Sequence, residues 1–358
     1  MIKIKNCTAD EFKIVLQEKK IICVGAGDEL KRICKKYSFI INSIRVVVDN
    51  NKKNTLFELE GKNFIVDSVE GVSVNSNDIL VVSTIKYADD IIKQIDNIAK
   101  FAGMDVYVPY FFEKNVHEKF EIKSNIYQIP KIIHYCWFGG GEIPDCFKNN
   151  IQSWKKYCPD YEIVCWDETN YDYKKNEYMY EAYKKKKWGF VPDYARLDIV
   201  NEYGGIYLDT DVEIIKPWDD LLQYKLFCGF ESDEYVAFGL GFGGIADNDI
   251  LQRMMDLYDK TSFLMPDGSL NLTASPIYQT EILKENGLKT NGELQNLNDC
   301  IVFPSEYFAP IDAYGIGKIT DNTYSIHQYA ATWFDEKTRF HKERIIESIS
   351  YVKGRMNN

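Results

Sequence analysis

The sequence lacks several features that mark specialised classes of protein. No stretch approaches the ~18 consecutive apolar residues of a membrane-spanning helix. Residues 1–6 contain no apolar signal core, so we expect a cytoplasmic protein. The nine cysteines are odd in number and include no CxxC pair, which argues for reduced thiols and against a zinc site. The net charge of −11 argues against general nucleic-acid binding.

The length and hydrophobic content predict two domains. The 358 residues exceed one average domain, and hydrophobic residues make up 45% of them, enough for more than one core. A charged stretch near residues 113–125 has the composition of a linker, and no internal repeat is visible. We therefore expect one domain at residues 1–115 and a second at residues 126–358.

Residues 1–115 alternate buried strands with helices, a pattern typical of a Rossmann-like parallel sheet. Thr8 and Glu11 have the spacing of a capping box, which predicts that a helix begins there. The predicted strands are 20–24, 44–48, 78–83 and 105–109, and further helices are predicted at 28–37 and 87–101. We expect an accessory module used for docking or regulation.

The same region leaves an NAD-binding alternative open. Gly25 and Gly27 fit the first two glycines of a GxGxxG motif, but Leu30 stands where the third belongs. Asp49 ends the second strand, where an acidic residue would hold a ribose. On this alternative the chain is an NAD-dependent sugar oxidoreductase.

Two aspartates follow a short apolar strand in the second half of the chain. Residues 206–208 read as a buried strand entered from a Gly-Gly turn and followed by Asp209, Thr210 and Asp211. Alternation along a strand would direct Asp209 and Asp211 to the same side. Carboxylate oxygens are ligands that Mg²⁺ or Mn²⁺ prefers, so the pair predicts a cation site; solvated aspartates at a strand end are the simpler interpretation.

A helix just upstream carries a second polar pair. Pro192 suits a first turn and Gly204 ends the helical pattern, so a helix is predicted between them. Asp193 and Arg196 are three residues apart and share one face. They form either a helix salt bridge or part of a ligand site.

Together these motifs resemble the glycosyltransferase 32 family, which includes capsular polysaccharide and yeast mannosyltransferases; the glucosylating domains of large clostridial toxins are more distant relatives. The resemblance covers roughly residues 128–340. It is carried by the Asp-x-x-Arg and Gly-Gly-x-Tyr-Leu-Asp-x-Asp strings and by segments 130–140, 150–154, 161–167 and 324–333. It implies a GT-A-type α/β domain that uses a nucleotide-diphospho-sugar, preceded by the small Rossmann-like domain.

The resemblance also implies roles for individual residues. Asp211 is expected to bind Mn²⁺ or Mg²⁺, with Asp209 and His327 as further ligands. Asp193 and Arg196 would hold hydroxyls or phosphate of the donor. The expected base-stacking residue is Trp137, and the residue expected to close over the donor phosphates is Trp333.

The expected reaction moves a hexose from a nucleotide sugar, with UDP as the expected nucleotide, to a surface or capsular glycan. Relatives transfer with retention, so no protein base is required; an inverting enzyme would need one, and Glu231 or Asp233 would be candidates. Glycines fill residues 239–244, where relatives often place a polar residue against the sugar, so the sugar is left open.

The acceptor side and the alternatives are less defined. Residues 271–275 are expected to line the acceptor side. Lys184, Lys185, Lys186 and Lys187 read as a solvated helix end or as a contact with anionic lipid headgroups at the inner face of the membrane. A nucleotidylyltransferase would need a basic Gly-rich loop, and Gly139, Gly140 and Gly141 have no Lys or Arg beside them. A non-catalytic glycan-assembly scaffold would not need the charged residues Asp193, Arg196, Asp209 and Asp211.

Overall fold

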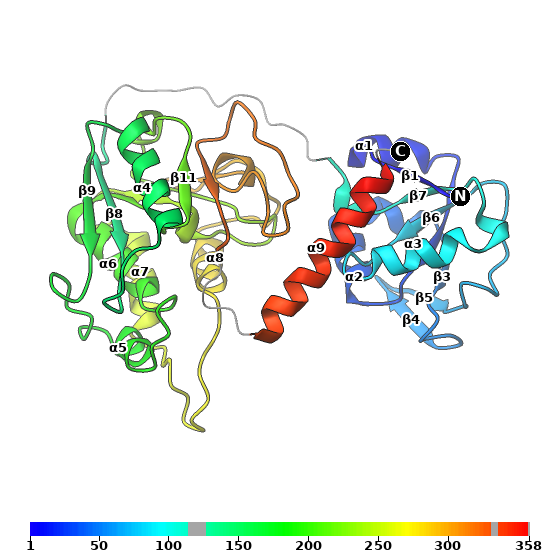
Figure 1. Cartoon of the computed structure of the whole chain (residues 1–358), viewed down its shortest axis with the longest axis horizontal. Coiled ribbons are helices and arrows are strands. Elements are labelled where there is room, and N and C mark those ends of the chain that lie inside the picture. The colour runs from blue at the N-terminus through cyan, green and yellow to red at the C-terminus, as the bar shows by residue number, and fades with distance from the viewer. Residues whose placement is uncertain (114–126, 331–335, 357–358) are drawn as a thin grey trace. The chain divides into compact units, whose positions relative to one another are not determined.

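The computed structural model describes residues 1–113, 127–330 and 336–356 (Figure 1). The chain forms two compact units. The first comprises Met1–Asn115, Tyr314–Ile316 and Asp335–Asn358, and the second comprises Val116–Ala313 and Gly317–Phe334. The two ends of the chain therefore belong to the same unit.

The first unit contains a five-stranded parallel sheet with the order β1-β7-β6-β2-β3. Its strands are β1 (Lys3–Lys5), β2 (Lys20–Val24), β3 (Ile44–Val48), β6 (Asp78–Val82) and β7 (Asp105–Tyr107). The central strands are runs of Ile, Leu and Val buried on both faces, as a parallel sheet requires. The predicted parallel sheet is therefore confirmed.

Helices α1 (Ala9–Val15), α2 (Asp28–Lys36) and α3 (Ala88–Asp96) accompany this sheet. The capping box is confirmed, since Thr8 Oγ1 accepts from the Glu11 amide while the Glu11 carboxylate accepts from the Thr8 amide. The helix predicted at 87–101 is shorter, because α3 ends at Asp96 and a 3₁₀ turn follows at Ala99–Phe101. The sequence did not predict β1 or the hairpin of β4 (Leu56–Leu59) and β5 (Lys62–Ile65).

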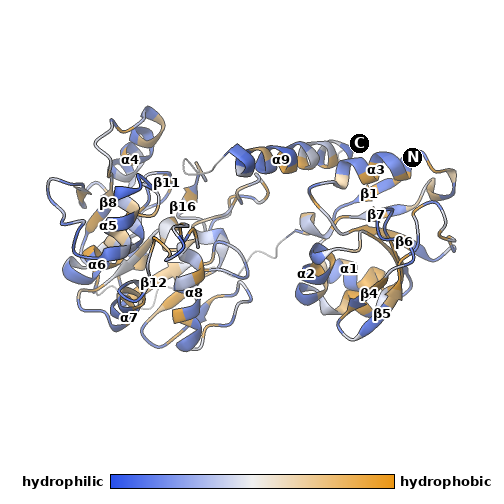
Figure 2. Cartoon of the chain, turned by 90° about the horizontal axis from the view of Figure 1, so that it is seen from below, coloured by the Kyte–Doolittle hydropathy of each residue, from blue (hydrophilic) through white to orange (hydrophobic). Residues whose placement is uncertain are grey.

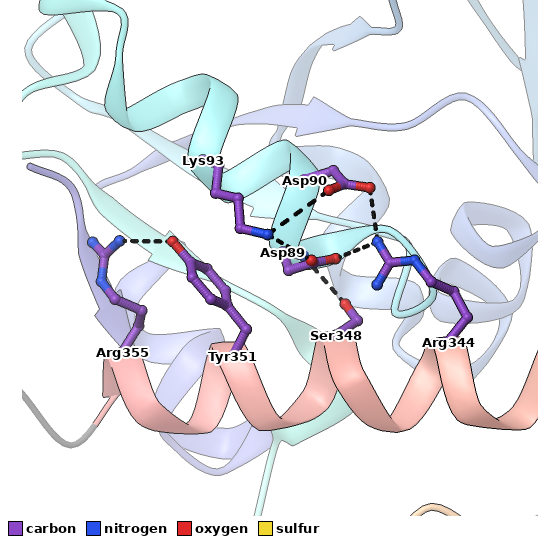
Figure 3. A network of polar contacts seen from close by, with 7 residues as sticks. All are labelled: Asp89, Asp90, Lys93, Arg344, Ser348, Tyr351 and Arg355. Atoms are coloured by element: carbon purple, nitrogen blue, oxygen red, sulfur yellow. Dashed lines mark hydrogen bonds and ion pairs between the residues drawn. The ribbon is translucent and has the colours of Figure 1, made fainter.

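The last helix, α9 (Glu336–Met356), packs in the first unit. Ile345, Ile349 and Val352 are buried in the core that includes Ile92 and Ile95 of α3. Polar contacts also join the two helices (Figure 3): Asp89 and Asp90 of α3 accept from Arg344, and the Asp89 amide donates to Ser348 Oγ. Lys93 pairs with both aspartates. The sequence analysis had assigned residues 336–356 to the second domain. The contact between Asp89 of α3 and Ser348 of α9 joins residues 259 positions apart, so local patterns in the sequence could not assign this helix to the first unit.

The second unit is built on a seven-stranded mixed sheet with the order β14-β15-β12-β13-β10-β8-β9. Its strands are β8 (Ile132–Cys136), β9 (Glu162–Trp166), β10 (Gly205–Tyr207), β12 (Leu226–Gly229), β13 (Phe242–Gly244), β14 (Gln295–Asn296) and β15 (Ile301–Phe303). Strands β8, β9, β10, β12 and β15 run in one direction, since β13 is antiparallel to both β10 and β12. Their carboxyl ends therefore share one edge, where ligands bind in open α/β sheets.

Helices cover both faces of this sheet. They are α4 (Asp145–Tyr157), α5 (Glu177–Lys184), α6 (Pro192–Tyr203), α7 (Asp249–Tyr258) and α8 (Ser275–Glu285). Alternation along β10 shows the two faces: Tyr207 packs in the cluster that contains residues of α6 and α7, whereas Ile206 packs in the cluster that contains Trp154 of α4. A two-stranded sheet of β11 (Val212–Ile214) and β16 (Ser325–His327) completes the unit.

The hydropathy colouring in Figure 2 follows this burial, with hydrophobic colour concentrated on the strands. None of the helices in residues 1–113, 127–330 and 336–356 combines the length and apolar character that crossing a bilayer requires. Taken together, the described residues form an α/β fold with two main sheets, one in each unit, and two smaller two-stranded sheets.

Candidate active site

The Asp-x-Asp segment is a tight connection between β10 and β11. Strand β10 ends at Tyr207, and the amide of Val212 donates to the carbonyl of Asp209 over 3.1 Å. The expectation that strand alternation aligns the two carboxylates is therefore wrong, because Asp209 and Asp211 lie beyond the strand. The turn brings them together instead.

Side chains of α4 hold this turn through its backbone. Asn150 Nδ2 donates to the carbonyl of Thr210 over 2.9 Å, and Trp154 Nε1 donates to the carbonyl of Val212 over 2.8 Å. Ser153 Oγ accepts from the amide of Ile214 at 2.9 Å. These contacts give a physical reason for the Asn-Ile-Gln-Ser-Trp string, which the sequence analysis identified only through its resemblance.

Pairing of β11 with β16 brings His327 to the turn. His327 lies opposite Val212 in the register, and its Nε2 is 3.1 Å from Asp211 Oδ1. Asp211 Oδ2 also accepts from the amide of Ala330 at 3.0 Å. One ligand atom from each of Asp209, Asp211 and His327 can be chosen so that all three lie within 4.8 Å of one another. The structure thus assembles the three predicted metal ligands.

Charges in this cluster are partly balanced. Burial raises the pKa of Asp209, aided by the charge on Asp211 and opposed by Arg196. Burial also opposes ionisation of Asp211, but the charge and hydrogen bond of His327 hold the pKa of Asp211 below its usual value. Burial lowers the pKa of His327 while Asp211 raises it, and the net direction is upward. The cluster carries more carboxylate than its neighbours neutralise, which suits a cation.

Helix α6 places Asp193 and Arg196 beside the same cluster. Both side chains are 5% exposed. Arg196 Nη2 lies 3.2 Å from Asp193 Oδ1 and 3.4 Å from Asp209 Oδ1. Burial raises the pKa of Asp193 to about 7, with a hydrogen bond from Ser275 acting in the opposite direction. The salt-bridge interpretation therefore applies, and Arg196 also reaches the Asp-x-Asp turn, whereas the ligand-site role of the pair stays a prediction.

The glycine-rich stretch has a packing role that the sequence analysis missed. A Cβ at Gly239 would overlap Asp209 Oδ2, and the Gly239 carbonyl accepts from the Asp209 amide at 3.3 Å. A Cβ at Gly241 would overlap Trp218, and one at Gly243 would overlap Phe227. The alternate spacing of the glycines in Phe-Gly-Leu-Gly-Phe-Gly was the available signal, since it predicts close approach along one face.

The remaining predicted residues are placed as follows. Trp137 follows β8 at the carboxyl edge, where its Nε1 donates to the Gly141 carbonyl over 2.7 Å and its ring packs on Phe147. Its predicted base stacking stays a prediction, and Trp333 lies outside the described residues. The lysine cluster sits at the end of α5, where Lys184, Lys185 and Lys186 are exposed and Lys187 is half-buried.

In the first unit, a cavity of about 370 Å³ is lined by Gly25, Gly27 and Asp49. The two oxygens of Asp49 accept from the amides of Ala26 and Asn51, at 3.0 and 2.9 Å. Asp28 and Glu29 begin α2, where a dinucleotide phosphate would bind. Asp49 therefore joins the loop after β2 to the loop after β3.

Comparison with known proteins identifies part of the second unit. Residues 144–227 match the family described as glycosyltransferase sugar-binding region containing DXD motif. This segment includes α4, α6 and the Asp209–Asp211 turn, which the geometry brings together. The predicted resemblance is confirmed.

Curated relatives match over similar stretches. Mannosyl phosphorylinositol ceramide synthase SUR1 of Saccharomyces cerevisiae is 30% identical over 156 residues, which are 42% of this chain and 38% of that protein. Inositol phosphoceramide mannosyltransferase 1 of Schizosaccharomyces pombe is 30% identical over 132 residues, covering 31% of this chain and 39% of the relative. The chain thus spans about two fifths of the length of these relatives.

Two solved structures also show similarity. PaToxG glycosyltransferase is 20% identical with a TM-score of 0.37, covering 44% of this chain and 68% of its own. A glycosyltransferase involved in glycosylation of the major capsid of PBCV-1 is 11% identical with a TM-score of 0.37. The match covers 60% of this chain and 98% of that structure's chain.

Proposed function

We propose that the second unit is a metal-dependent, GT-A-type glycosyltransferase that moves a hexose from a nucleotide sugar to a hydroxyl acceptor. One observation carries this proposal: three potential cation ligands, Asp209, Asp211 and His327, converge next to the buried Asp193–Arg196 pair. The family match over residues 144–227 supports it independently.

The donor set fits a hard divalent cation. Two carboxylates and an imidazole suit Mn²⁺ or Mg²⁺, and the turn that carries the carboxylates is fixed by α4 and β16. When bound, such a cation would offset the negative charge of the departing nucleoside diphosphate. Asp209 and Asp211 would hold it, with His327 as the third ligand.

The Asp193–Arg196 pair is proposed to hold the donor. A guanidinium suits anionic oxygens and a carboxylate suits vicinal hydroxyls, so Arg196 binds phosphate while Asp193 binds sugar or ribose. Because Pro192 O accepts from Arg196 Nε at 3.1 Å, the guanidinium keeps a fixed orientation. Trp137 is proposed to stack on the nucleotide base, and transfer is proposed to proceed with retention.

The acceptor is proposed to be a glycan or a glycolipid headgroup. The curated relatives are named for mannosyl transfer to inositol phosphoceramide, which favours a mannosyl donor and an anionic lipid acceptor as the first pair to test. A surface or capsular glycan is the other acceptor considered. Exposed Lys184, Lys185 and Lys186 would provide peripheral contact with an anionic surface of the cytoplasmic membrane.

Thermal-shift measurements with UDP, GDP and NAD, each with and without Mn²⁺, test this function. Ligands that bind only the native state raise the melting temperature. We expect a metal-dependent rise with UDP that disappears in Asp211→Asn. A rise with GDP instead would keep the transferase and assign a GDP-sugar donor. A response to NAD alone would contradict the proposal and favour the oxidoreductase alternative in the first unit.

A further inference from the structure

Residues 137–141 form a glycine-rich loop after β8, at the same sheet edge as the candidate cation site, because β8 and β10 are parallel. Gly139 and Gly140 have φ angles of +100° and +67°, which lie in the region that favours glycine. The Trp137 side chain is fixed to this loop, since its Nε1 donates to the carbonyl of Gly141 over 2.7 Å. A displacement of the loop would therefore displace the residue that is proposed to stack on the nucleotide base.

The indole of Trp188 packs against the backbone of this loop. A Cβ at Gly139 would lie 2.9 Å from Trp188 Cε2, so the indole occupies the space that a side chain at position 139 would need. The ring is 37% exposed and comes from the segment that follows α5. Because so much of it faces solvent, its contact with the loop is a contact at the sheet edge rather than part of a buried core.

Two further side chains complete the support of the loop. The Gly139 amide donates to Glu168 Oε1 over 2.5 Å. The ring of Tyr183, in α5, packs edge-on against Trp188 with the centroids 5.1 Å apart. Burial and a hydrogen bond to Glu168 raise the pKa of the Tyr183 hydroxyl to about 12. Gly139 is thus held by Glu168 on its amide and by Trp188 beside its Cα. Tyr183 connects these two supports, so loop, carboxylate and rings form one continuous assembly.

We infer that Trp188 is a positioning residue, which holds residues 137–141 in the conformation that binds the nucleotide base. This inference rests on the proposed function. A loop that is ordered beforehand binds its ligand more tightly, because less conformational freedom is lost on binding. The Asp-x-Asp turn is held separately, by α4 and β16. Loss of the indole should therefore weaken nucleotide binding and leave cation binding unchanged.

Calorimetric titration of the full chain with Mn²⁺ alone, and then with UDP at saturating Mn²⁺, tests the inference; GDP replaces UDP if the wild type binds only GDP. We expect Trp188→Ala to weaken nucleotide binding by about tenfold, the effect of having to order one or two side chains on binding, with unchanged Mn²⁺ affinity. Trp188→Phe keeps a ring beside Gly139 and should recover most of the affinity. Tyr180→Ala, in α5, removes a ring that contacts Tyr173 rather than the loop, and this matched control should bind as the wild type does.

The outcomes separate this inference from the proposed function. If the wild type and Trp188→Ala bind the nucleotide equally well, the positioning role is wrong. A parallel loss of Mn²⁺ and nucleotide affinity would show that the substitution disturbs the whole site and would also overturn the inference. Unchanged nucleotide affinity with a raised acceptor KM would assign Trp188 to the acceptor instead. If the wild type itself binds neither UDP nor GDP, the proposed function fails, and the inference fails with it. Circular dichroism of both Trp188 variants checks that they fold.

Discussion

The two units bury acidic side chains in opposite ways. In the first unit, Asp89 accepts from Arg344 at 2.7 Å and from Lys93 at 2.9 Å, so one carboxylate has two cations (Figure 3). In the second unit, Asp193 and Asp209 share the single guanidinium of Arg196. Asp89 and Asp193 are buried and Asp209 is half-buried, but the main difference is the number of cations per carboxylate.

The consequences for ionisation differ in direction. Burial opposes the charge of Asp89, yet hydrogen bonds from Arg344 and Lys93 lower its pKa to about 2. Burial raises the pKa of Asp193 to about 7, and Arg196 only partly offsets it. The comparison teaches that compensated buried charge supports architecture, whereas surplus buried carboxylate indicates a place for a ligand cation.

The strongest test removes a surplus carboxylate. Asp209→Asn is expected to lower sugar transfer by about 10²–10³-fold, the range seen when one transition-state contact is lost. Its melting temperature should be equal or higher, because the folded state already disfavours the charge on Asp209. Steady-state kinetics and thermal denaturation measure both effects.

Exposed Asp256→Asn, in α7 of the same unit, is the control and should change neither quantity. A large loss of stability in Asp209→Asn would show that this carboxylate is structural, and the contrast between the units would then disappear.

Removing a cation from the first unit should have the reverse result, a loss of stability rather than a loss of sugar transfer. Arg344→Leu removes one of the two cations that pair with Asp89 and Asp90 and leaves only Lys93, at an expected cost of about 2 kcal/mol. Hydrogen exchange should then accelerate in α3 but not in α6. Arg339→Leu, an exposed change on the same helix, is the matched control.

The pH dependence of this variant gives a second check. The lowered pKa of Asp89 contributes stability above the usual carboxyl pKa, and that contribution is lost as pH falls from about 4 toward 2. The difference between the wild type and Arg344→Leu should therefore shrink over that interval. A constant difference would mean that Arg344 acts through packing.

Adding a methyl group at Gly239 tests the position of the Asp209 carboxylate without removing its charge. Gly239→Ala places a methyl group against Asp209 Oδ2 and should displace the carboxylate, lowering transfer by about 10²-fold as expected for a misplacement near 1 Å. Gly27→Ala in the first unit meets no atom within 4 Å and is the control. Equal activity of Gly239→Ala and the wild type would show that Asp209 tolerates movement.

The smallest predicted effect concerns support of the turn. Ser153→Ala removes the acceptor for the Ile214 amide and should cost about 1 kcal/mol of stability. Ser350→Ala on α9 removes an exposed hydrogen bond within one helix and should cost less. Urea denaturation followed by unit-specific hydrogen exchange compares them. Equal effects would mean that the α4 contact contributes little.

Local signals predicted much of this architecture. Strands β2, β3 and β6 are apolar runs bounded by turn residues, and α6 has Pro192 in its first turn and Gly204 after its end. Strand β1 was missed because three residues, Lys-Ile-Lys, form a strand only by pairing with β7. Such pairing depends on contacts distant in the chain.

The candidate site was predictable where its residues are close in sequence and much less so where they are distant. Asp193 and Arg196 share a helix face, and Asp209 and Asp211 share a turn, so local spacing identified each pair. The Asp211–Ala330 contact joins residues 119 positions apart, and only the resemblance to a family placed His327 beside Asp211. The spacing of the glycines indicates close approach in this stretch, but it does not identify Asp209 as the residue that a side chain at Gly239 would meet, because that depends on the packed position of Asp209.

The membership of α9 in the first unit has a consequence for synthesis. In topological terms the second unit is an insertion, since its segments lie between the two ends of the first. During translation, residues 127–330 emerge before Ile345, Ile349 and Val352, which close the core around α3. The inserted unit can therefore fold on the ribosome while the first unit still exposes an apolar surface. The first unit starts synthesis earliest and completes its fold last.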